Sequence, residues 1–206
     1  MCSVKFSLPI LAVASLVLAA CGGSKTSAPP TTVRTLPPSS TATAAGPGAL
    51  QAEANSAAAG DIPDNQVFLV FRNGAAGYSM KYPEGWAQRG ARRQVTFRDK
   101  NNIVRVVVAT GAAPTAASVL SEVRALPGAT LSHGPQHLTL VGKPALKITY
   151  TTVSAPNPVT GKRVKLVVDR YYLWKEGRRA VVDLGTPQGV DNVDAYRLMI
   201  ESFRWR

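Results

Sequence analysis

Gly77-Tyr78-Ser79-Met80-Lys81-Tyr82-Pro83-Glu84-Gly85-Trp86 is the stretch that decides the fold of this 206-residue chain. Its first half alternates large apolar side chains with polar ones, as a strand with one buried face does. The Pro-Glu-Gly sequence that follows is typical of a turn. The stretch therefore predicts a strand over residues 78–82 that ends in a turn, with Trp86 beyond it.

Further strand patterns follow, rich in Val, Tyr and Thr and separated by Gly, Pro or Asn. They cover residues 94–98, 103–110, 136–141, 145–153, 164–174 and 180–184. Residues 114–126 and 191–203 each carry an apolar stripe at helical spacing, and Asp191 is the expected N-cap of the second helix. This order predicts an α+β fold, in which helices flank a mostly antiparallel sheet.

The opening stretch resembles the aromatic-x-aromatic-Pro-x-Gly-Trp start of the PsbP-like, or Mog1/PsbP, superfamily. The resemblance continues in the 164–184 hairpin and in the closing helix with Tyr196, Ser202 and Phe203. It covers most of residues 66–206 and implies an α/β/α sandwich. It does not imply one activity, because members of the superfamily serve as extrinsic photosystem subunits, nuclear-transport cofactors and bacterial lipoproteins of unassigned role. No residue here matches a family catalytic motif.

The N-terminus predicts export. Lys5 precedes an apolar run, Phe6 to Leu18, that is too short to span a bilayer as a helix. Leu18-Ala19-Ala20-Cys21-Gly22 then resembles the lipobox of bacterial lipoproteins, in which the cysteine thiol receives diacylglycerol. We expect residues 1–20 to be a lipoprotein signal peptide and Cys21 to be lipidated. The anchored protein would lie on the extracytoplasmic face of a cell membrane. The alternative is an ordinary secretory signal with an incidental cysteine.

Residues 21–60 predict a flexible tether. Pro pairs, Ser, Thr and Ala dominate the segment, and it contains no aromatic residue and too few large apolar residues to form a core. The folded domain is therefore expected over residues 61–206. Both cysteines of the chain, Cys2 and Cys21, precede it. This excludes a disulfide framework, a cysteine-based zinc site and a thiol nucleophile from the domain.

The charge is strongly basic. The chain carries 24 Lys and Arg against 12 Asp and Glu, and residues 61–206 carry 21 against 11, a net charge of +10. Such an excess favours contact with anionic surfaces. For an exported protein these would be anionic lipid or acidic cell-wall polymer, and not nucleic acid. The densest group of basic residues follows Trp86 and supplies the candidate contacts: Arg89, Arg92, Arg93, Arg98 and Lys100. Lys162, Arg163 and Lys165 form a second group, and Arg178 and Arg179 a third.

Residues that often carry chemistry are sparse. His133 and His137 are separated by Gly134-Pro135, which argues against a shared metal, so no metal and no cofactor are expected. A hairpin that turns on Glu176-Gly177 would set Arg170 opposite Asp183 and Asp169 opposite Leu184. An Arg170–Asp183 ion pair is then expected in place of a catalytic carboxylate pair. No nucleophile elbow, P-loop or dinucleotide motif occurs.

The leading hypothesis is a membrane-anchored, non-catalytic binding or interaction module, with a protein partner possible. One alternative is a carrier or accessory subunit for a lipid or other apolar ligand held between sheet and helix. Tyr78, Tyr82 and Trp86 could line such a pocket, although large aromatics more often pack a core. A hydrolytic enzyme is the remote alternative.

Overall fold

The structure is a computed structural model that describes residues 48, 51–52, 55, 59–157 and 161–206. The predicted signal peptide, Cys21 and most of the predicted tether lie outside these residues. Within them, no helix is long and apolar enough to cross a membrane. The helices are α2 (Ala116–Arg124) and α3 (Val193–Glu201), and the strands are β1 (Phe68–Asn73), β2 (Tyr78–Pro83), β3 (Ala87–Ala91), β4 (Gln94–Asp99), β5 (Asn102–Thr110), β6 (Thr130–Leu140), β7 (Lys143–Val153), β8 (Lys165–Lys175), β9 (Arg178–Pro187) and β10 (Arg204–Trp205).

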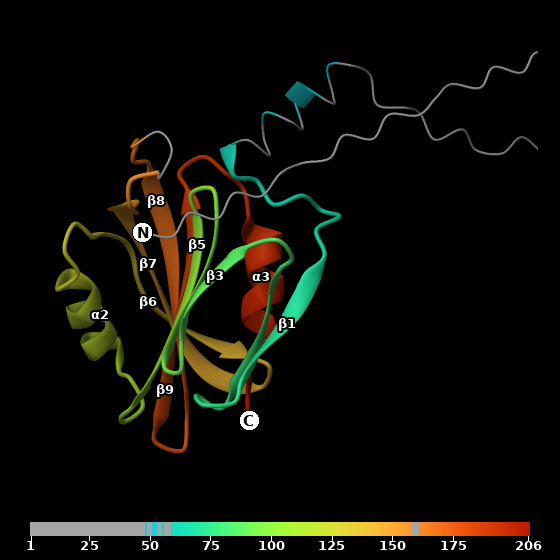
Figure 1. Cartoon of the computed structure of the whole chain (residues 1–206). Coiled ribbons are helices and arrows are strands. Elements are labelled where there is room, and N and C mark those ends of the chain that lie inside the picture. Colours follow the sequence, from blue (N-terminus) through green and yellow to red (C-terminus); the bar gives the residue numbers. More distant parts are fainter. Residues whose placement is uncertain (1–47, 49–50, 53–54, 56–58, 158–160) are drawn as a thin grey trace, which may run out of the picture. The chain divides into compact units, whose positions relative to one another are not determined.

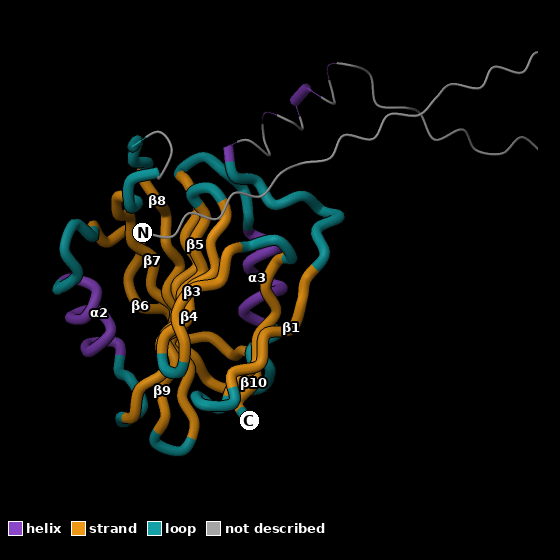
Figure 2. The backbone as a smooth tube through the Cα atoms, in the orientation of Figure 1, coloured by secondary structure: helices purple, strands orange, loops and turns teal. Residues whose placement is uncertain are grey.

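The domain is built around a seven-stranded sheet of strand order β3-β4-β5-β9-β8-β7-β6, in which every pairing is antiparallel. Helix α2 lies on one side of this sheet, and α3 and β1 lie on the other (Figure 1). Strands β1, β2 and β10 form a second, three-stranded sheet (Figure 2). The α+β fold with helices flanking a mostly antiparallel sheet is confirmed.

Two packed layers of apolar side chains hold the fold together. On the α3 side, alternate residues of β5 (Val104, Val106 and Val108) are buried in the larger cluster. On the α2 side, Val119 and Val123 of the helix pack against β7 and β8. Buried side chains thus pack between the large sheet and both helices, where the alternative hypothesis places a carried apolar ligand.

The aromatic residues of the opening stretch belong to the larger cluster. Tyr78 is fully buried and Trp86 is 8% exposed. The Tyr78 ring stacks on Phe203 at a centroid distance of 5.4 Å, and the Tyr82 ring stacks on Phe97 at 4.4 Å. These rings pack the three-stranded sheet onto the large sheet, so the interpretation as core, and not as pocket lining, is confirmed.

The end of the predicted tether is part of the packed domain. The buried Gly60 carbonyl accepts hydrogen bonds from Asn102 Nδ2 at 2.5 Å and from Asn192 Nδ2 at 3.2 Å. The Ile62 amide donates to Asn192 Oδ1 at 2.8 Å. We call these three hydrogen bonds the Gly60 clamp. They fasten the start of the domain to β5 and to the residue before α3.

The same asparagine corrects the predicted start of the second helix. The N-cap of α3 is Asn192, and not Asp191 as expected. The Asn192 side chain does not cap the helix, because it is engaged in the Gly60 clamp and with Thr186. Asp191 still accepts a hydrogen bond from the Val193 amide at 3.1 Å.

Candidate functional site

The fold separates the five candidate contact residues. Arg89 of β3 and Arg98 of β4 lie on the side of the sheet that carries α2, since Arg89 opposes Thr96 two residues from Arg98. Arg92 and Arg93 form the turn between β3 and β4. Lys100 lies in the turn at the other end of β4, about 20 Å away for a strand of this length. They therefore do not form one patch.

Arg92 and Arg93 instead join other basic residues at one end of the domain. Asn73 Nδ2 donates to the Arg92 carbonyl at 2.7 Å, and the Val108 amide donates to the Arg93 carbonyl at 2.7 Å. The Gly111 amide donates to the Gly177 carbonyl at 2.9 Å, which brings in the β8–β9 turn. The strand ends and turns that meet here carry Arg72, Arg92, Arg93, Lys143, Lys175, Arg178 and Arg206, a set that we call the basic end.

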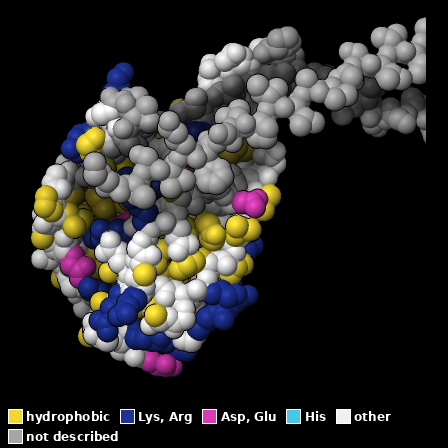
Figure 3. All heavy atoms as spheres, viewed as in Figure 1, with side chains coloured by type: hydrophobic (Ala, Val, Ile, Leu, Met, Phe, Trp, Pro, Cys, Tyr) yellow, Lys and Arg dark blue, Asp and Glu magenta, His cyan; other side chains and the backbone are white. Residues whose placement is uncertain are grey.

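The basic end gathers cationic side chains on neighbouring turns and strand ends. Figure 3 shows Lys and Arg side chains gathered at this end of the molecule. Arg178 is fixed there, because its guanidinium lies 4.9 Å from the centroid of the Trp205 ring and donates to the Arg206 carbonyl at 3.2 Å. Among the described residues on these turns, Glu176 is the one acidic side chain, 3.5 Å from Lys175 Nζ. The fold thus brings Arg93 and Arg178, which are 85 residues apart in sequence, to the same end of the domain.

The carboxylates of the central strands are engaged in ion pairs. Arg170 and Asp183 face each other in the register that the sequence predicted. Arg170 Nε and Nη2 donate to the two Asp183 oxygens at 2.5 and 2.9 Å, and Arg105 Nε lies 3.4 Å from Oδ2. Although burial opposes its charge, the hydrogen bonds to Asp183 raise the pKa of Arg170 above its ordinary value. Asp169 is bound by Lys147 Nζ at 2.8 Å. The predicted Arg170–Asp183 ion pair is confirmed.

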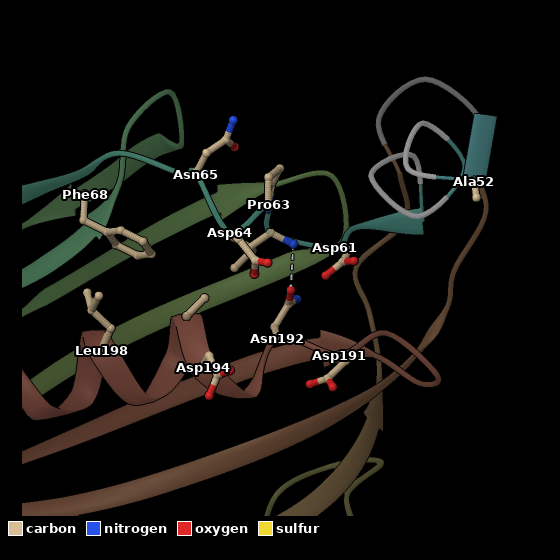
Figure 4. Close-up of a pocket in the computed structure, with 12 residues that line it drawn as sticks. Ala52, Asp61, Pro63, Asp64, Asn65, Phe68, Asp191, Asn192, Asp194 and Leu198 are labelled. Atoms are coloured by element: carbon tan, nitrogen blue, oxygen red, sulfur yellow. Dashed lines mark hydrogen bonds between the residues drawn. The ribbon is translucent and has the colours of Figure 1, made fainter. Parts of the chain in front are cut away.

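A groove that the sequence did not indicate runs between β1 and α3. It consists of two hollows of about 780 and 620 Å³ that share Asp194 and Leu198. Phe68 of β1 and Leu198 of α3 lie on opposite sides of the first hollow (Figure 4). Val70 of β1 lines the second. We call the two hollows together the β1–α3 groove.

The two ends of the β1–α3 groove differ in charge. The end next to the Gly60 clamp carries four carboxylates, from Asp61, Asp64, Asp191 and Asp194. The other end carries mainly basic side chains, from Lys81, Arg197 and Arg204, with Glu201. The groove therefore has apolar side chains in both hollows, most of them in the first, and it is acidic at one end and mixed in charge at the other.

The histidines do not gather a metal site. Both lie on β6, an outer strand of the large sheet, and both are exposed. Irregular pairing interrupts the strand between His133 and Gln136. In the part of the chain that the structure describes, no group of three or more His, Cys, Asp or Glu residues is arranged to hold a metal ion.

Comparison with known proteins identifies the fold. No family model and no curated protein matches this chain. Among solved structures, cyanobacterial PsbP (CyanoP) from Synechocystis sp. PCC 6803 is 16% identical over 71% of this chain and 98% of its own, with a TM-score of 0.53. The Ran-binding protein Mog1p of Saccharomyces cerevisiae (10% identity, 68% and 96% coverage, TM-score 0.42) and LpqN, involved in cell envelope biogenesis in Mycobacterium tuberculosis (18%, 68% and 91%, 0.37), are more distant. The domain has a PsbP/Mog1-like fold, as the opening stretch implied.

Proposed function

We propose that this protein is a lipid-anchored, non-catalytic binding module on the extracytoplasmic face of a cell membrane, and that its basic end contacts phosphate-bearing anionic surfaces. The observation that carries the proposal is the basic end itself, where seven cationic side chains and one carboxylate meet on neighbouring turns. An interaction role also fits the central strands, because their carboxylates, Asp169 and Asp183, are held in ion pairs with Lys147 and Arg170 and do not form an acid–base pair.

The expected contact is weak and sensitive to salt. Each Lys or Arg near an anionic surface contributes about 1 kcal/mol. The attraction is screened within about 8 Å at physiological ionic strength. A predicted tether of some 40 residues would let the domain move between bound and free positions without leaving the membrane.

The anchor is tested first. Lipidation requires the Cys21 thiol, so Cys21→Ala should leave an unlipidated chain that is absent from the membrane fraction or remains there as uncleaved precursor. Mass spectrometry of the wild-type protein should show acyl groups on an N-terminal Cys21. An unmodified Cys21 would contradict the lipoprotein assignment and leave the basic end to be tested alone.

The basic end is tested by sedimentation. Full-length protein in nanodiscs of neutral lipid is mixed with sucrose-loaded vesicles that contain either neutral lipid alone or phosphatidylglycerol as well. We expect pelleting with the anionic vesicles at low salt and its loss at high salt. Soluble polyphosphate should compete if any phosphate surface suffices, and should fail if the membrane interface is required.

Charge reversal locates the contact. Glu substitutions at Arg92, Arg93 and Arg178 should abolish pelleting. The matched control reverses Lys162, Arg163 and Lys165, an equal change in net charge outside the basic end. Equal loss in both variants would mean that binding follows net charge alone, and no binding by the wild type at low salt would refute the proposal.

A further inference from the structure

We propose that the β1–α3 groove is a docking site for an extended segment of a partner protein, one that carries apolar side chains and, at the end that meets the aspartates, Lys or Arg. This proposal is independent of the basic end, and no residue of the basic end lines the groove.

The apolar character of the region is the first argument. Eight large apolar side chains in the described part of the chain are exposed, and five of them lie on α3, on β1 or directly before it: Val67 (55% exposed), Leu69 (39%), Val70 (50%), Val193 (65%) and Leu198 (38%). Single exposed apolar residues are normal, but exposed apolar side chains that line a hollow are typical of an interaction site. Two of the five, Val70 and Leu198, line the groove itself.

The free backbone edge of β1 favours a partner segment in an extended conformation. Within the described residues, β1 pairs with β2 and with no other strand, so it is an edge of the three-stranded sheet. An edge strand offers backbone donors and acceptors to an added strand. Phe68 and Val70 are two positions apart on β1, so they project on the same side and into the groove. Alternate apolar side chains of an added strand would meet them.

The charges that line the groove indicate the charge of the partner segment and the direction in which it lies. The domain carries a net charge of +10, yet three aspartates lie at one end of the groove and a fourth, Asp194, lies where the two hollows meet. Asp64 and Asp194 are exposed there, although Asp194 also binds Arg197. Carboxylates disfavour an anionic lipid or a fatty acid head group at this end. They favour a cationic segment, whose basic residues point towards the Gly60 clamp.

The experiment uses full-length protein in neutral nanodiscs and a short synthetic peptide of alternating Val and Thr that begins with two Lys. The peptide bears a fluorophore and a photoreactive group. Its matched probe has Glu in place of Lys. We expect the Lys peptide to bind and the Glu peptide not to bind. Crosslinks should fall on residues 66–72 and 193–201.

Variants test each part of the groove. Asp64→Asn and Asp194→Asn should each raise the Kd of the Lys peptide by up to about fivefold, the size of an exposed charge pair. Leu198→Ser should weaken both peptide binding and crosslinking, and because Leu198 is an exposed residue outside the core the domain should stay folded. Asp99→Asn, outside the groove, is the matched control and should change nothing.

The outcomes separate this proposal from the previous one. Arg92→Glu with Arg93→Glu should leave peptide binding intact while vesicle binding falls. Equal binding of the Lys and Glu peptides, crosslinks confined to other surfaces, or no binding at all would overturn the groove assignment. Self-association of the protein through β1, seen as dimers that the peptide does not displace, would also overturn it.

Discussion

At the residue scale, Asp183 is the carboxylate on which the central strands depend. It is 6% exposed, lies between Arg170 and Arg105 on neighbouring strands, and binds the buried Arg170 through both oxygens. Asp169, one position along on β8 from Arg170, makes its ion pair with Lys147 where both side chains are partly exposed. The two aspartates therefore allow a buried and an exposed ion pair to be compared in one sheet.

We expect Asp183→Ala to lower the free energy of unfolding by about 3–5 kcal/mol, because it leaves the buried Arg170 without a counter-charge. Asp169→Ala should cost about 1 kcal/mol or less, since its partner can reach water. Urea unfolding of both variants measures the difference. Equal losses would show that solvent reaches Arg170 in the folded protein.

Buried tyrosines make the domain sensitive to alkaline pH. Burial raises the pKa of Tyr150 and of Tyr172 from 10 to about 12. The neutral phenol is therefore favoured in the folded state, and the stability that it contributes is complete below pH 10. As pH rises from 10 to 12 that stability is lost, at about 1.4 kcal/mol per pH unit for each tyrosine.

Tyr172→Phe should reduce this alkaline loss. The Tyr172 hydroxyl is fully buried and has no hydrogen-bond partner among the described residues, so its removal should change stability at pH 7 by less than about 1 kcal/mol. Between pH 10 and 12 the variant should lose less stability than the wild type does. Chemical unfolding at several pH values measures how steeply the stability of each protein falls with pH. Identical slopes would mean that ionisation of Tyr172 does not contribute to the alkaline loss.

At the element scale, the turn of the β3–β4 hairpin places Arg92, a proposed contact residue, in a strained backbone conformation. Arg92 has a φ of 53°, in the left-handed region that favours Gly or Asn. Arg93, the other turn residue, is not among the described residues with positive φ. Lys100, Val141 and Glu176 also have positive φ, so this conformation recurs in the turns of the domain.

Arg92→Gly should therefore stabilise the domain by about 0.5–1 kcal/mol, whereas Arg93→Gly should destabilise it by a similar amount. Both variants remove one charge from the basic end, so both should weaken vesicle binding alike. Thermal unfolding and sedimentation of the pair separate the two effects. Loss of stability in Arg92→Gly would mean that the arginine side chain makes a stabilising contact.

The sequence predicted β4, β5 and β8 to within one residue, because their burial alternates along the strand. β7 and β9 do not alternate in this way, and their Val- and Tyr-rich composition identified them instead. β3 was missed because all five of its residues are exposed and show no alternation. β6 begins six residues before its predicted start, because Gly134-Pro135 was read as a break although the strand continues through irregular pairing.

At the scale of the whole molecule, neither of the two proposed binding surfaces was predictable. Only one strand register, that of the 164–184 hairpin, could be predicted, and it does not show that the turns holding Arg93 and Arg178 meet. The groove joins residues 62–70 to residues 194–198, more than 120 positions away. Such contacts depend on how the three-stranded sheet packs on the large sheet, which local patterns do not encode.

The start of the domain gives a further prediction. A chain shortened to begin at Ala59 keeps the Gly60 clamp and should unfold cooperatively. A chain that begins at Pro63 loses all three hydrogen bonds and leaves the buried Asn102 and Asn192 amides short of partners. We expect it to be less stable by about 1–3 kcal/mol in urea unfolding. Equal stability of the two chains would show that water replaces the clamp.

The Gly60 clamp also has a mechanical consequence. A force that pulls on the chain ahead of Gly60 reaches the clamp before it reaches β1. Asn102 begins β5, an inner strand of the large sheet, and Asn192 directly precedes α3. Tension therefore passes into β5 and α3. The edge strand β1 is thereby shielded from load. An anchored protein under strain could keep the β1–α3 groove in shape until the clamp itself gives way.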